Sequence, residues 1–238
     1  MRKTLDTEGK AFPDRERVSL VIPVLNEETG LRELIEKACP YAGEILVIDG
    51  HSTDRSAAVA GESGARVHFD NRKGKGDALR CAIPLVTREI TVFMDADGSH
   101  DPDDIPKLVR PIVEGRADHV TGSRLLGGSS ELHGGFDEFL RLMGSSFITA
   151  CIGHRFKVRI SDSQNGFRAV RTDVLRRLDL RENITTIEQE MIIKTLKSGF
   201  RLDEVPAHEY KRMAGRSHIR VGKVWFRYGY SLFKYLTF

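Results

Sequence analysis

The stretch EITVFMDADGSHDPDDI, residues 89–105, joins an apolar run rich in β-branched residues to five aspartates within residues 95–104. Such a run is typical of a buried β-strand, so the acidic residues crowd the loop where the strand ends. Two like charges about 4 Å apart cost roughly 4 kcal/mol at an effective dielectric constant of about 20. The stretch therefore predicts either a cation at this loop or a structural role for some of the carboxylates.

Helix signals account for three of these aspartates. Asp101 is a good N-cap residue, Pro102 suits the first helical position, and Asp104 stands where a capping box places its acidic residue. Asp103 adds negative charge at the positive end of the helix dipole. We therefore predict a helix over residues 102–115.

Asp95 and Asp97 precede that helix and form a D-x-D motif at the strand end. An EF-hand calcium loop is excluded, because it requires glycine at the position of His100 and glutamate at the position of Pro106. Mg²⁺ and Mn²⁺ are held by one or two carboxylates together with substrate phosphates in many enzymes. The motif suits a divalent metal shared with a phosphorylated substrate, although for the motif in isolation a plain turn is the better interpretation.

Similar apolar runs precede this strand and alternate with helix-like stretches. The alternation predicts βαβ units, an α/β fold and a mostly parallel sheet buried on both faces. Ligands of such sheets bind beyond the carboxyl ends of the strands, where this chain carries polar and charged loops. The other strands are expected at residues 18–24, 44–49 and 65–69, with helices within 26–38, 52–64 and 73–86.

The second half of the chain is less regular. A strand is expected at 118–124, a Gly/Ser stretch covers 125–135, and a mixed segment extends to about residue 160. Helices are expected from Thr172 and over 185–199, and a strand over 200–210. We find no internal repeat and expect one domain.

Composition fits a soluble globular protein, with 238 residues, 40% of them hydrophobic and 30% charged. The excess of 37 Lys and Arg over 34 Asp and Glu is too small to indicate nucleic-acid binding. The three cysteines show neither zinc-site spacing nor a disulfide framework, which favours a reducing cytoplasm. The polar tail 1–17 lacks the apolar core of a signal peptide, and the longest uncharged run, 142–153, is too short to cross a bilayer.

Seven motifs occur in one order along the chain, and as a set they resemble the family 2 inverting glycosyltransferases of the GT-A fold. Within that family they are most similar to the polyprenyl-phosphate branch, which includes dolichol-phosphate mannose synthase. The motifs are IPVLNEE (22–28), LVIDGHSTDRS (46–56), KGKGDALR (73–80), FMDADGSHDP (93–102), TGSR (121–124), SDSQNGFRA (161–169) and EVPAHEYKRMAGRSH (204–218).

The resemblance covers about residues 18–220 and implies a Rossmann-like GT-A domain, with a nucleotide-sugar half at 18–124 and an acceptor half at 125–220. It implies an NDP-sugar donor, Mg²⁺ or Mn²⁺, and transfer of a hexose or N-acetylhexosamine, with inversion, to a polyprenyl phosphate. It also implies a cytoplasmic protein that is peripheral at the membrane face.

On the donor side, the resemblance implies that Pro23, Asn26 and Glu27 line the nucleoside and that Asp49 accepts a hydrogen bond from base or ribose. Lys75, between two glycines, corresponds to the family's phosphate-side lysine. Asn26 and Glu27 are also compatible with a helix start. The run from Asp49 reads D-G-H-S, where the family often has D-D-G-S.

The same resemblance implies that Asp95 and Asp97 hold the metal, with Asp97 the more direct ligand and Ser99 a candidate third. The metal would neutralise the diphosphate leaving group, which makes Asp97 a catalytic candidate. For His100, a hydrogen-bonded loop histidine is the better interpretation.

A phosphate acceptor is anionic near neutral pH and needs cations rather than a general base, whereas an alcohol acceptor needs a carboxylate base. Arginine suits bidentate phosphate binding. The resemblance implies that Arg124 and Arg212 are catalytic and that Arg141 and Arg216 assist acceptor binding. Lysine is frequent in the family at the position of His218.

Four polar residues in family-like motifs, Asp162, Gln164, Glu188 and Glu190, would orient the sugar hydroxyls or supply a base to an alcohol. For Glu188 and Glu190, a solvated helix face is the alternative. A soluble alcohol or phosphorylated metabolite is the alternative acceptor. Nucleotidyl transfer is the rival reaction, although the first strand lacks the Gly-rich loop typical of nucleotidyltransferases.

The C-terminal segment 221–238 has the spacing of an amphipathic helix. Three positive charges within it argue against a transmembrane span. Such a helix suits the headgroup region of a membrane, or packs on its own domain or a second subunit. One face would carry Val221, Val224, Trp225, Tyr228, Leu232 and Tyr235, widened by Phe226, Tyr230, Phe233 and Phe238 and interrupted by Lys223, Arg227 and Lys234.

Overall fold

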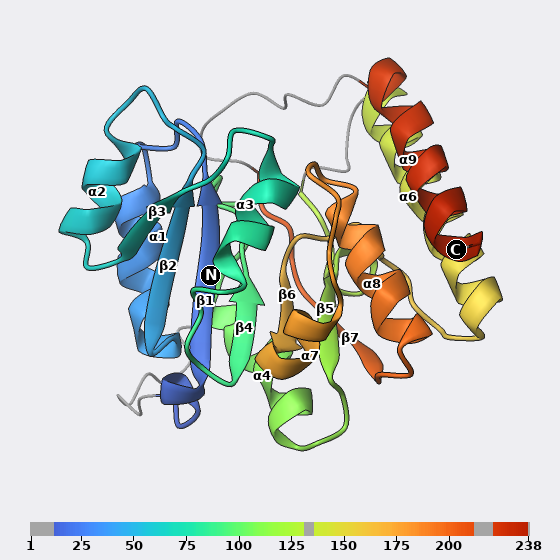
Figure 1. Ribbon diagram of the computed structural model, residues 1–238, viewed down its shortest axis with the longest axis horizontal. Coiled ribbons are helices and arrows are strands. Elements are labelled where there is room, and N and C mark those ends of the chain that lie inside the picture. Colours follow the sequence, from blue (N-terminus) through green and yellow to red (C-terminus); the bar gives the residue numbers. More distant parts are fainter. Residues whose placement is uncertain (1–11, 131–135, 212–220, 238) are drawn as a thin grey trace, which may run out of the picture.

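The computed structural model describes residues 12–130, 136–211 and 221–237, and gives the side chains of α6 and α9 (bounds below) only from residues 142 and 226 onward. Its strands form one sheet (Figure 1). The strands are β1 (Val18–Val24), β2 (Glu44–Asp49), β3 (Arg66–Phe69), β4 (Ile90–Phe93), β5 (His119–Ser123), β6 (Arg168–Arg171) and β7 (Leu202–Pro206). Their spatial order is β3-β2-β1-β4-β6-β5-β7. Only β6 runs antiparallel to its neighbours among these strands, so the predicted mostly parallel sheet is confirmed.

Helices cover both faces of the sheet because successive strand residues point in opposite directions. In β1, Leu20 and Ile22 belong to one hydrophobic cluster and Val21 to the other. The first cluster includes α1 (Leu31–Ala38), α2 (Ser56–Glu62) and α4 (Ile105–Val113). The second includes α3 (Lys75–Ala82), α7 (Thr172–Arg177) and α8 (Ile187–Lys197).

A third cluster joins α8 to α6 (Phe136–Phe156) and α9 (Val221–Thr237), which lie side by side at one end of the molecule (Figure 1). Leu232 and Tyr235 of α9 are buried against α6 and α8. The predicted C-terminal helix is therefore confirmed, and one of its faces packs on its own domain. No helix in the described ranges is long and apolar enough to span a bilayer.

One strand and two helices were not predicted from the sequence, namely β6, α5 (Arg124–Gly127) and α6. The helix α6 contains Gly144, Ser145, Ser146 and Gly153, which are poor helix formers, and its regular form depends on packing against α8 and α9. The strand β6 has only four residues and lies inside the motif SDSQNGFRA, where no alternating pattern marks it. The short helix α5 follows β5 directly.

The predicted helix start at Asp101 is confirmed. The Asp101 carboxylate accepts a hydrogen bond from the Asp103 backbone N–H at 3.0 Å, and the turn Pro102–Asp104 leads into α4. Lys37 of α1 lies 2.7 Å from the Asp101 carboxylate. These contacts assign Asp101 and its neighbours a structural role.

Asp118, just before β5, joins β5 to the end of β6 and to the chain that enters β7. It accepts hydrogen bonds from the Arg201 backbone N–H at 2.9 Å and side chain at 2.9 and 3.0 Å, and from Arg171 at 3.2 Å. The hydrogen bonds from the Arg201 side chain are the main cause that lowers the pKa of Asp118 from 3.8 to about 2. A depressed carboxylate pKa stabilises the fold above pH 4, and this contribution is lost as the pH falls through about 2.

We expect Asp118→Asn to lower the free energy of unfolding at pH 7 by at most about 2 kcal/mol, because the substitution removes the carboxylate whose depressed pKa stabilises the fold. The difference from the wild type should shrink as the pH falls from 4 to 2. Urea unfolding across this range measures it, with Asp173→Asn, at an exposed partner of Arg171, as the control. A difference that does not change with pH would contradict the assignment.

Candidate functional site

The candidate site lies where the loops after β1, β2 and β4 meet the loop before β6. β6 runs antiparallel to its neighbours β4 and β5, so its amino end lies at the same edge of the sheet as the carboxyl ends of those two strands. Ligands of α/β sheets bind at this edge. The structure thus brings the loop of residues 161–167 to the D-x-D loop, although the two are more than 60 positions apart in the chain.

Lys75, Asp95 and Glu188 form an ion cluster, here called the lysine cluster. Lys75 Nζ lies 2.6 Å from Asp95 Oδ1 and 2.9 Å from Glu188 Oε1. Burial by itself would lower the pKa of the Lys75 ammonium, but the two carboxylates outweigh it and raise that pKa. Lys75 therefore stays charged throughout the neutral range and balances one of the two negative charges.

Gly166 allows the lysine cluster to form. A Cβ atom at this position would lie 2.8 Å from both Asp95 Oδ2 and Lys75 Nζ. Gly76 has a different role, since a Cβ atom there would lie 2.6 Å from the Glu182 carbonyl oxygen. The glycines around Lys75 therefore allow α3 to approach the chain before α8.

Arg168 supports the lysine cluster from within the sheet. Its side chain is fully buried, and it donates hydrogen bonds to the Glu188 carbonyl oxygen at 2.9 Å and to the Asn165 carbonyl oxygen. Burial lowers the pKa of Arg168, and the nearby carboxylates of Glu188, Asp162 and Asp95 oppose that effect. Sequence reasoning missed Arg168, although it stands inside the quoted motif SDSQNGFRA.

The D-x-D loop is held in place by side-chain hydrogen bonds. Asp97 Oδ1 accepts hydrogen bonds from Ser99 Oγ at 2.6 Å and from the Ser99 N–H at 3.1 Å. His100 is buried, hydrogen-bonded to Asn165 Oδ1 at 3.0 Å and stacked on Phe167 at 5.0 Å between ring centroids. Burial lowers its pKa, which keeps the ring neutral. The interpretation of His100 as a hydrogen-bonded loop histidine is confirmed.

The donor atoms in this loop are oxygens, which suit Mg²⁺ or Mn²⁺. In the described part of the chain, no three His, Cys, Asp or Glu side chains are grouped to hold a metal ion. A metal completed by substrate phosphates requires only one or two carboxylates. Asp95, Asp97 and the Ser99 hydroxyl fit that kind of site.

Asn26 ties the loop after β1 to the loop after β2. Its backbone has a positive φ of 57°, its Oδ1 accepts a hydrogen bond from the Thr53 N–H at 2.8 Å, and its own N–H donates to Ser52 Oγ at 2.9 Å. Asparagine tolerates this left-handed conformation better than most residues. The two loops therefore form one connected surface.

Glu27 follows, and its backbone N–H donates to Ser56 Oγ at 2.9 Å. The helix α1 begins only at Leu31. The alternative that Asn26 and Glu27 start this helix is therefore wrong.

Pro23 and Asp49 lie near the ends of β1 and β2. Pro23 pairs with Ile48 in the sheet. Asp49 Oδ1 accepts a hydrogen bond from the Ser52 N–H at 2.7 Å, and its buried Oδ2 has no hydrogen-bond partner among the residues that the structure describes. Asp49 thus retains capacity to accept a hydrogen bond.

His51 stands at the departure from the family's D-D-G-S run, with a positive φ of 67°. Its Nδ1 accepts from Arg72 at 3.2 Å, so its Nε2–H donates to the Asp70 carbonyl oxygen at 2.9 Å. The ring lies 5.3 Å from that of Phe69, which is exposed. His51 therefore joins the loop after β2 to the loop after β3.

On the acceptor side, Arg124 forms a bidentate pair with Asp162, with distances of 2.6 Å from Nε and 3.0 Å from Nη2. Glu209 lies 3.3 Å from Arg124 Nη1 and also accepts from Ser129 Oγ at 2.6 Å. Burial by itself would lower the pKa of the Arg124 guanidinium, but the two carboxylates outweigh burial and raise that pKa above its ordinary value. An anionic ligand here would have to compete with two carboxylates for one guanidinium.

Glu188 and Glu190 are both buried, so the alternative of a solvated helix face is wrong. Only Glu188 reaches the lysine cluster. Glu190 instead accepts hydrogen bonds from the N–H groups of Arg181 and Glu182, both at 2.8 Å, and contacts Lys194 at 2.8 Å. Glu190 therefore binds the chain that precedes α8.

The remaining predicted acceptor residues are only partly described. The Gln164 backbone N–H donates to Asp162 Oδ1 at 3.1 Å, which places Gln164 beside the Arg124 pair. Arg141 lies in α6, where only the backbone is described, and Arg212 and Arg216 lie outside the described residues.

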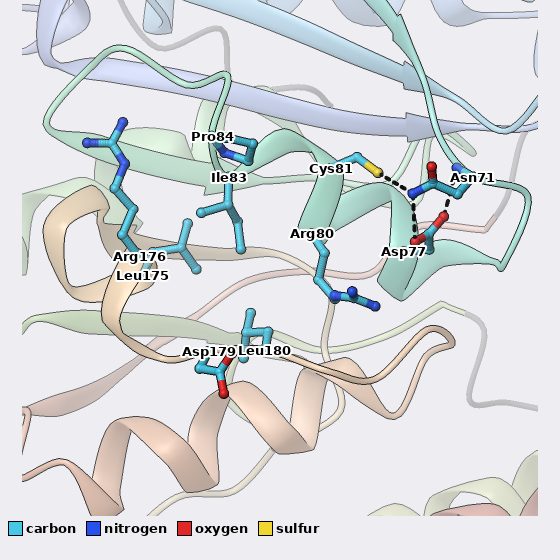
Figure 2. A pocket seen from close by; sticks show the side chains of 10 residues that line it. All are labelled: Asn71, Asp77, Arg80, Cys81, Ile83, Pro84, Leu175, Arg176, Asp179 and Leu180. Carbon is cyan, nitrogen blue, oxygen red and sulfur yellow. Dashed lines mark hydrogen bonds between the residues drawn. The ribbon is translucent and has the colours of Figure 1, made fainter.

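A cavity of about 270 Å³ lies between α3 and α7, away from these residues (Figure 2). On one side of it, the Asn71 side-chain NH₂ donates to Asp77 and to Cys81 (Figure 2). None of the predicted site residues lines this cavity. It is lined by Asn71, Asp77, Arg80, Cys81, Ile83, Pro84, Leu175, Arg176, Asp179 and Leu180.

Comparison with known proteins identifies the family, because residues 19–179, more than half of the chain, match glycosyl transferase family 2. The chain belongs to this family. The family and the GT-A fold indicated by the sequence motifs are therefore confirmed.

The relatives match over most of their length. An uncharacterized glycosyltransferase of Mycobacterium tuberculosis is 30% identical, covering 85% of this chain and 89% of its own. A dolichyl-phosphate hexose transferase of Haloferax volcanii is 28% identical, covering 85% and 86%. The fold also matches glucosyl-3-phosphoglycerate synthase from Mycobacterium tuberculosis, crystallised with Mn²⁺, UDP and glucosyl-3-phosphoglycerate. For that structure the TM-score is 0.72 at 23% identity, covering 92% of this chain and 80% of that one.

We expect Gly166→Ala to lower the free energy of unfolding by about 1–3 kcal/mol, because the added methyl group must displace Lys75 or Asp95. Urea unfolding measures the loss. Gly61→Ala in α2 is the control, since nothing lies within 4 Å of its added Cβ and alanine favours the helix. Equal stability of Gly166→Ala and the wild type would contradict the packing described for the lysine cluster.

Proposed function

We propose that the protein is an inverting glycosyltransferase that transfers a hexose or N-acetylhexosamine from an NDP-sugar to a polyprenyl phosphate. The observation that carries the proposal is the contact between Lys75 and Asp95 beside Asp97, in a chain of glycosyl transferase family 2. The contact supports the proposal because an ammonium group beside carboxylates at the ligand edge of the sheet suits a diphosphate together with a divalent metal.

In this proposal, Pro23, Asn26, Glu27 and Asp49 bind the nucleoside. Asp95 and Asp97, with Ser99, would hold Mg²⁺ or Mn²⁺, which when bound neutralises the diphosphate leaving group. The donor diphosphate takes the place of Asp95 as partner of Lys75, so the ammonium stabilises charge on the departing phosphate.

On the acceptor side, Arg124 and Arg212 hold the acceptor phosphate, assisted by Arg141 and Arg216. Its anionic oxygen attacks the anomeric carbon from the side opposite the diphosphate, which inverts the configuration. No general base is required, because that oxygen is already deprotonated near neutral pH. Asp162 then serves to orient Arg124, with Gln164 beside it.

The relatives support two acceptor classes. The Haloferax volcanii relative is a dolichyl-phosphate hexose transferase, which favours a lipid phosphate. Glucosyl-3-phosphoglycerate synthase favours a soluble phosphorylated metabolite, and it matches in fold alone. We prefer the lipid phosphate because the sequence relative is the closer of the two, and we expect the protein to act in the cytoplasm at a membrane surface.

A screen of NDP-sugars with each acceptor tests the proposal directly. We expect sugar transfer with undecaprenyl or dolichyl phosphate and no transfer with 3-phosphoglycerate, measured as labelled glycolipid extracted into organic solvent. Transfer to 3-phosphoglycerate instead would replace the first acceptor class with the second.

We expect Asp97→Ala to reduce transfer at least 100-fold, because the diphosphate leaving group loses its counter-charge. EDTA should abolish wild-type activity, and Mn²⁺ or Mg²⁺ should restore it. Asp101→Ala is the control, since loss of this N-cap costs about 1 kcal/mol of stability and leaves the site intact. Full activity of Asp97→Ala in EDTA would rule out the metal assignment.

We expect Arg124→Ala to raise the KM for polyprenyl phosphate or to lower kcat, with a change of less than threefold in the Kd of the nucleoside diphosphate. The reason is that the ion pairs of Arg124 are made with Asp162 and Glu209, on the other side of the site from the proposed nucleotide-binding residues. Steady-state kinetics and calorimetric titration separate the two effects. Normal use of polyprenyl phosphate by this variant would favour the soluble acceptor.

A further inference from the structure

Exposed hydrophobic side chains are concentrated on α6 and α9. Between 53% and 82% of the surface of each of these side chains is accessible. Isolated exposed hydrophobic residues are ordinary, but a contiguous group marks an interaction surface. We call the group the aromatic face; it consists of Met143, Phe147, Phe226, Tyr230 and Phe233.

These residues lie on the solvent-exposed sides of two neighbouring helices. Within α9, Phe226, Tyr230 and Phe233 are spaced four and three residues apart, so they share one side of the helix. Met143 and Phe147 share one side of α6 in the same way. The two helices lie side by side (Figure 1), and their other sides are occupied by the third hydrophobic cluster.

The charge of both helices selects the kind of partner. α9 contains no Asp or Glu, and α6 contains two acidic residues, Asp137 and Glu138, both in its first turn. The basic residues of α9 are Lys223, Arg227 and Lys234, and those of α6 are Arg141 and Arg155. A second copy of this chain docked face to face would bring these like charges together, which disfavours a symmetric dimer. An anionic lipid surface complements them, and aromatic side chains suit its headgroup region.

We propose that the aromatic face binds the headgroup region of an anionic bilayer. This inference rests on the proposed function, because such binding would bring the acceptor side to a membrane-embedded polyprenyl phosphate. The element that precedes α6 in the chain is α5, which carries Arg124 and the exposed Leu125 and Leu126. The net positive charge of α9 attracts anionic lipid, and binding therefore weakens as salt rises.

The test is flotation with vesicles of phosphatidylcholine containing 30% or so phosphatidylglycerol, compared with pure phosphatidylcholine, at low and at high salt. We expect the wild type to float with the anionic vesicles at low salt. The triple variant Phe226→Ser, Tyr230→Ser, Phe233→Ser should lose at least tenfold in vesicle partitioning, and Arg227→Glu severalfold. Phe69→Ser, which removes an exposed phenylalanine from β3 at the far edge of the sheet, should float like the wild type.

Point substitutions are preferred to truncation, because deleting α9 would also remove Leu232 and Tyr235 from the third hydrophobic cluster. Circular dichroism checks that the variants remain folded, and Arg227→Glu, at an exposed position, provides an independent readout of the same surface. The inference is overturned if the triple variant floats like the wild type, or if flotation is insensitive to lipid charge. The inference is also overturned if sedimentation shows that the wild type is a dimer and that the triple variant is a monomer.

Transfer assays separate this inference from the proposed function. The triple variant should retain wild-type transfer to a water-soluble short-chain prenyl phosphate and lose at least tenfold with undecaprenyl phosphate embedded in vesicles. Lipid binding without transfer to either acceptor would overturn the proposed function alone. Equal transfer by variant and wild type from vesicles would overturn the inference alone.

Discussion

One ammonium group holds together the two halves of the site. Lys75 begins α3 in the first half of the chain, and its partners Asp95 and Glu188 come from the end of β4 and the start of α8. Removing the lysine would leave two carboxylates facing each other with little water to separate them, and an uncompensated buried charge is strongly destabilising. Gly166, in the loop before β6, leaves space for this contact. Arg168, in β6 itself, supports the contact by fixing the first turn of α8.

The donor and acceptor sides share a common electrostatic design. Lys75 and Arg124 are each paired with two carboxylates. Such pairing fixes the position of each cation before a phosphate arrives, which lowers the ordering cost of binding. It also imposes selectivity, because a ligand must offer enough negative charge, or bring its own metal, to displace a carboxylate that is already well placed. Two negatively charged substrates would displace these carboxylates more readily than two neutral substrates.

Sequence patterns predicted residues 18–124 more completely than residues 125–220. The strands β1 and β2 were predicted with their observed bounds, because each is a continuous apolar run followed by turn residues. The contact between Lys75 and Asp95 could be anticipated only through family motifs, since 20 residues separate them. Arg168 could not be found by local reasoning, because a buried guanidinium is stable only when distant carbonyl groups and carboxylates surround it. Sequence patterns did not predict the helix α6 and the strand β6, because tertiary contacts rather than local propensity make these two elements regular.

The antiparallel strand β6 has a consequence for how the chain is made. It fills the gap between β4 and β5, so neither of those strands meets the other directly. During synthesis, a ribosome-bound chain that ends before Arg168 has completed β4 but leaves one side of it without a partner. Unpaired strand edges are templates for association with other chains. Between the emergence of β4 and the emergence of β6, the nascent protein therefore has an unpaired strand edge, which is the kind of surface that chaperones protect.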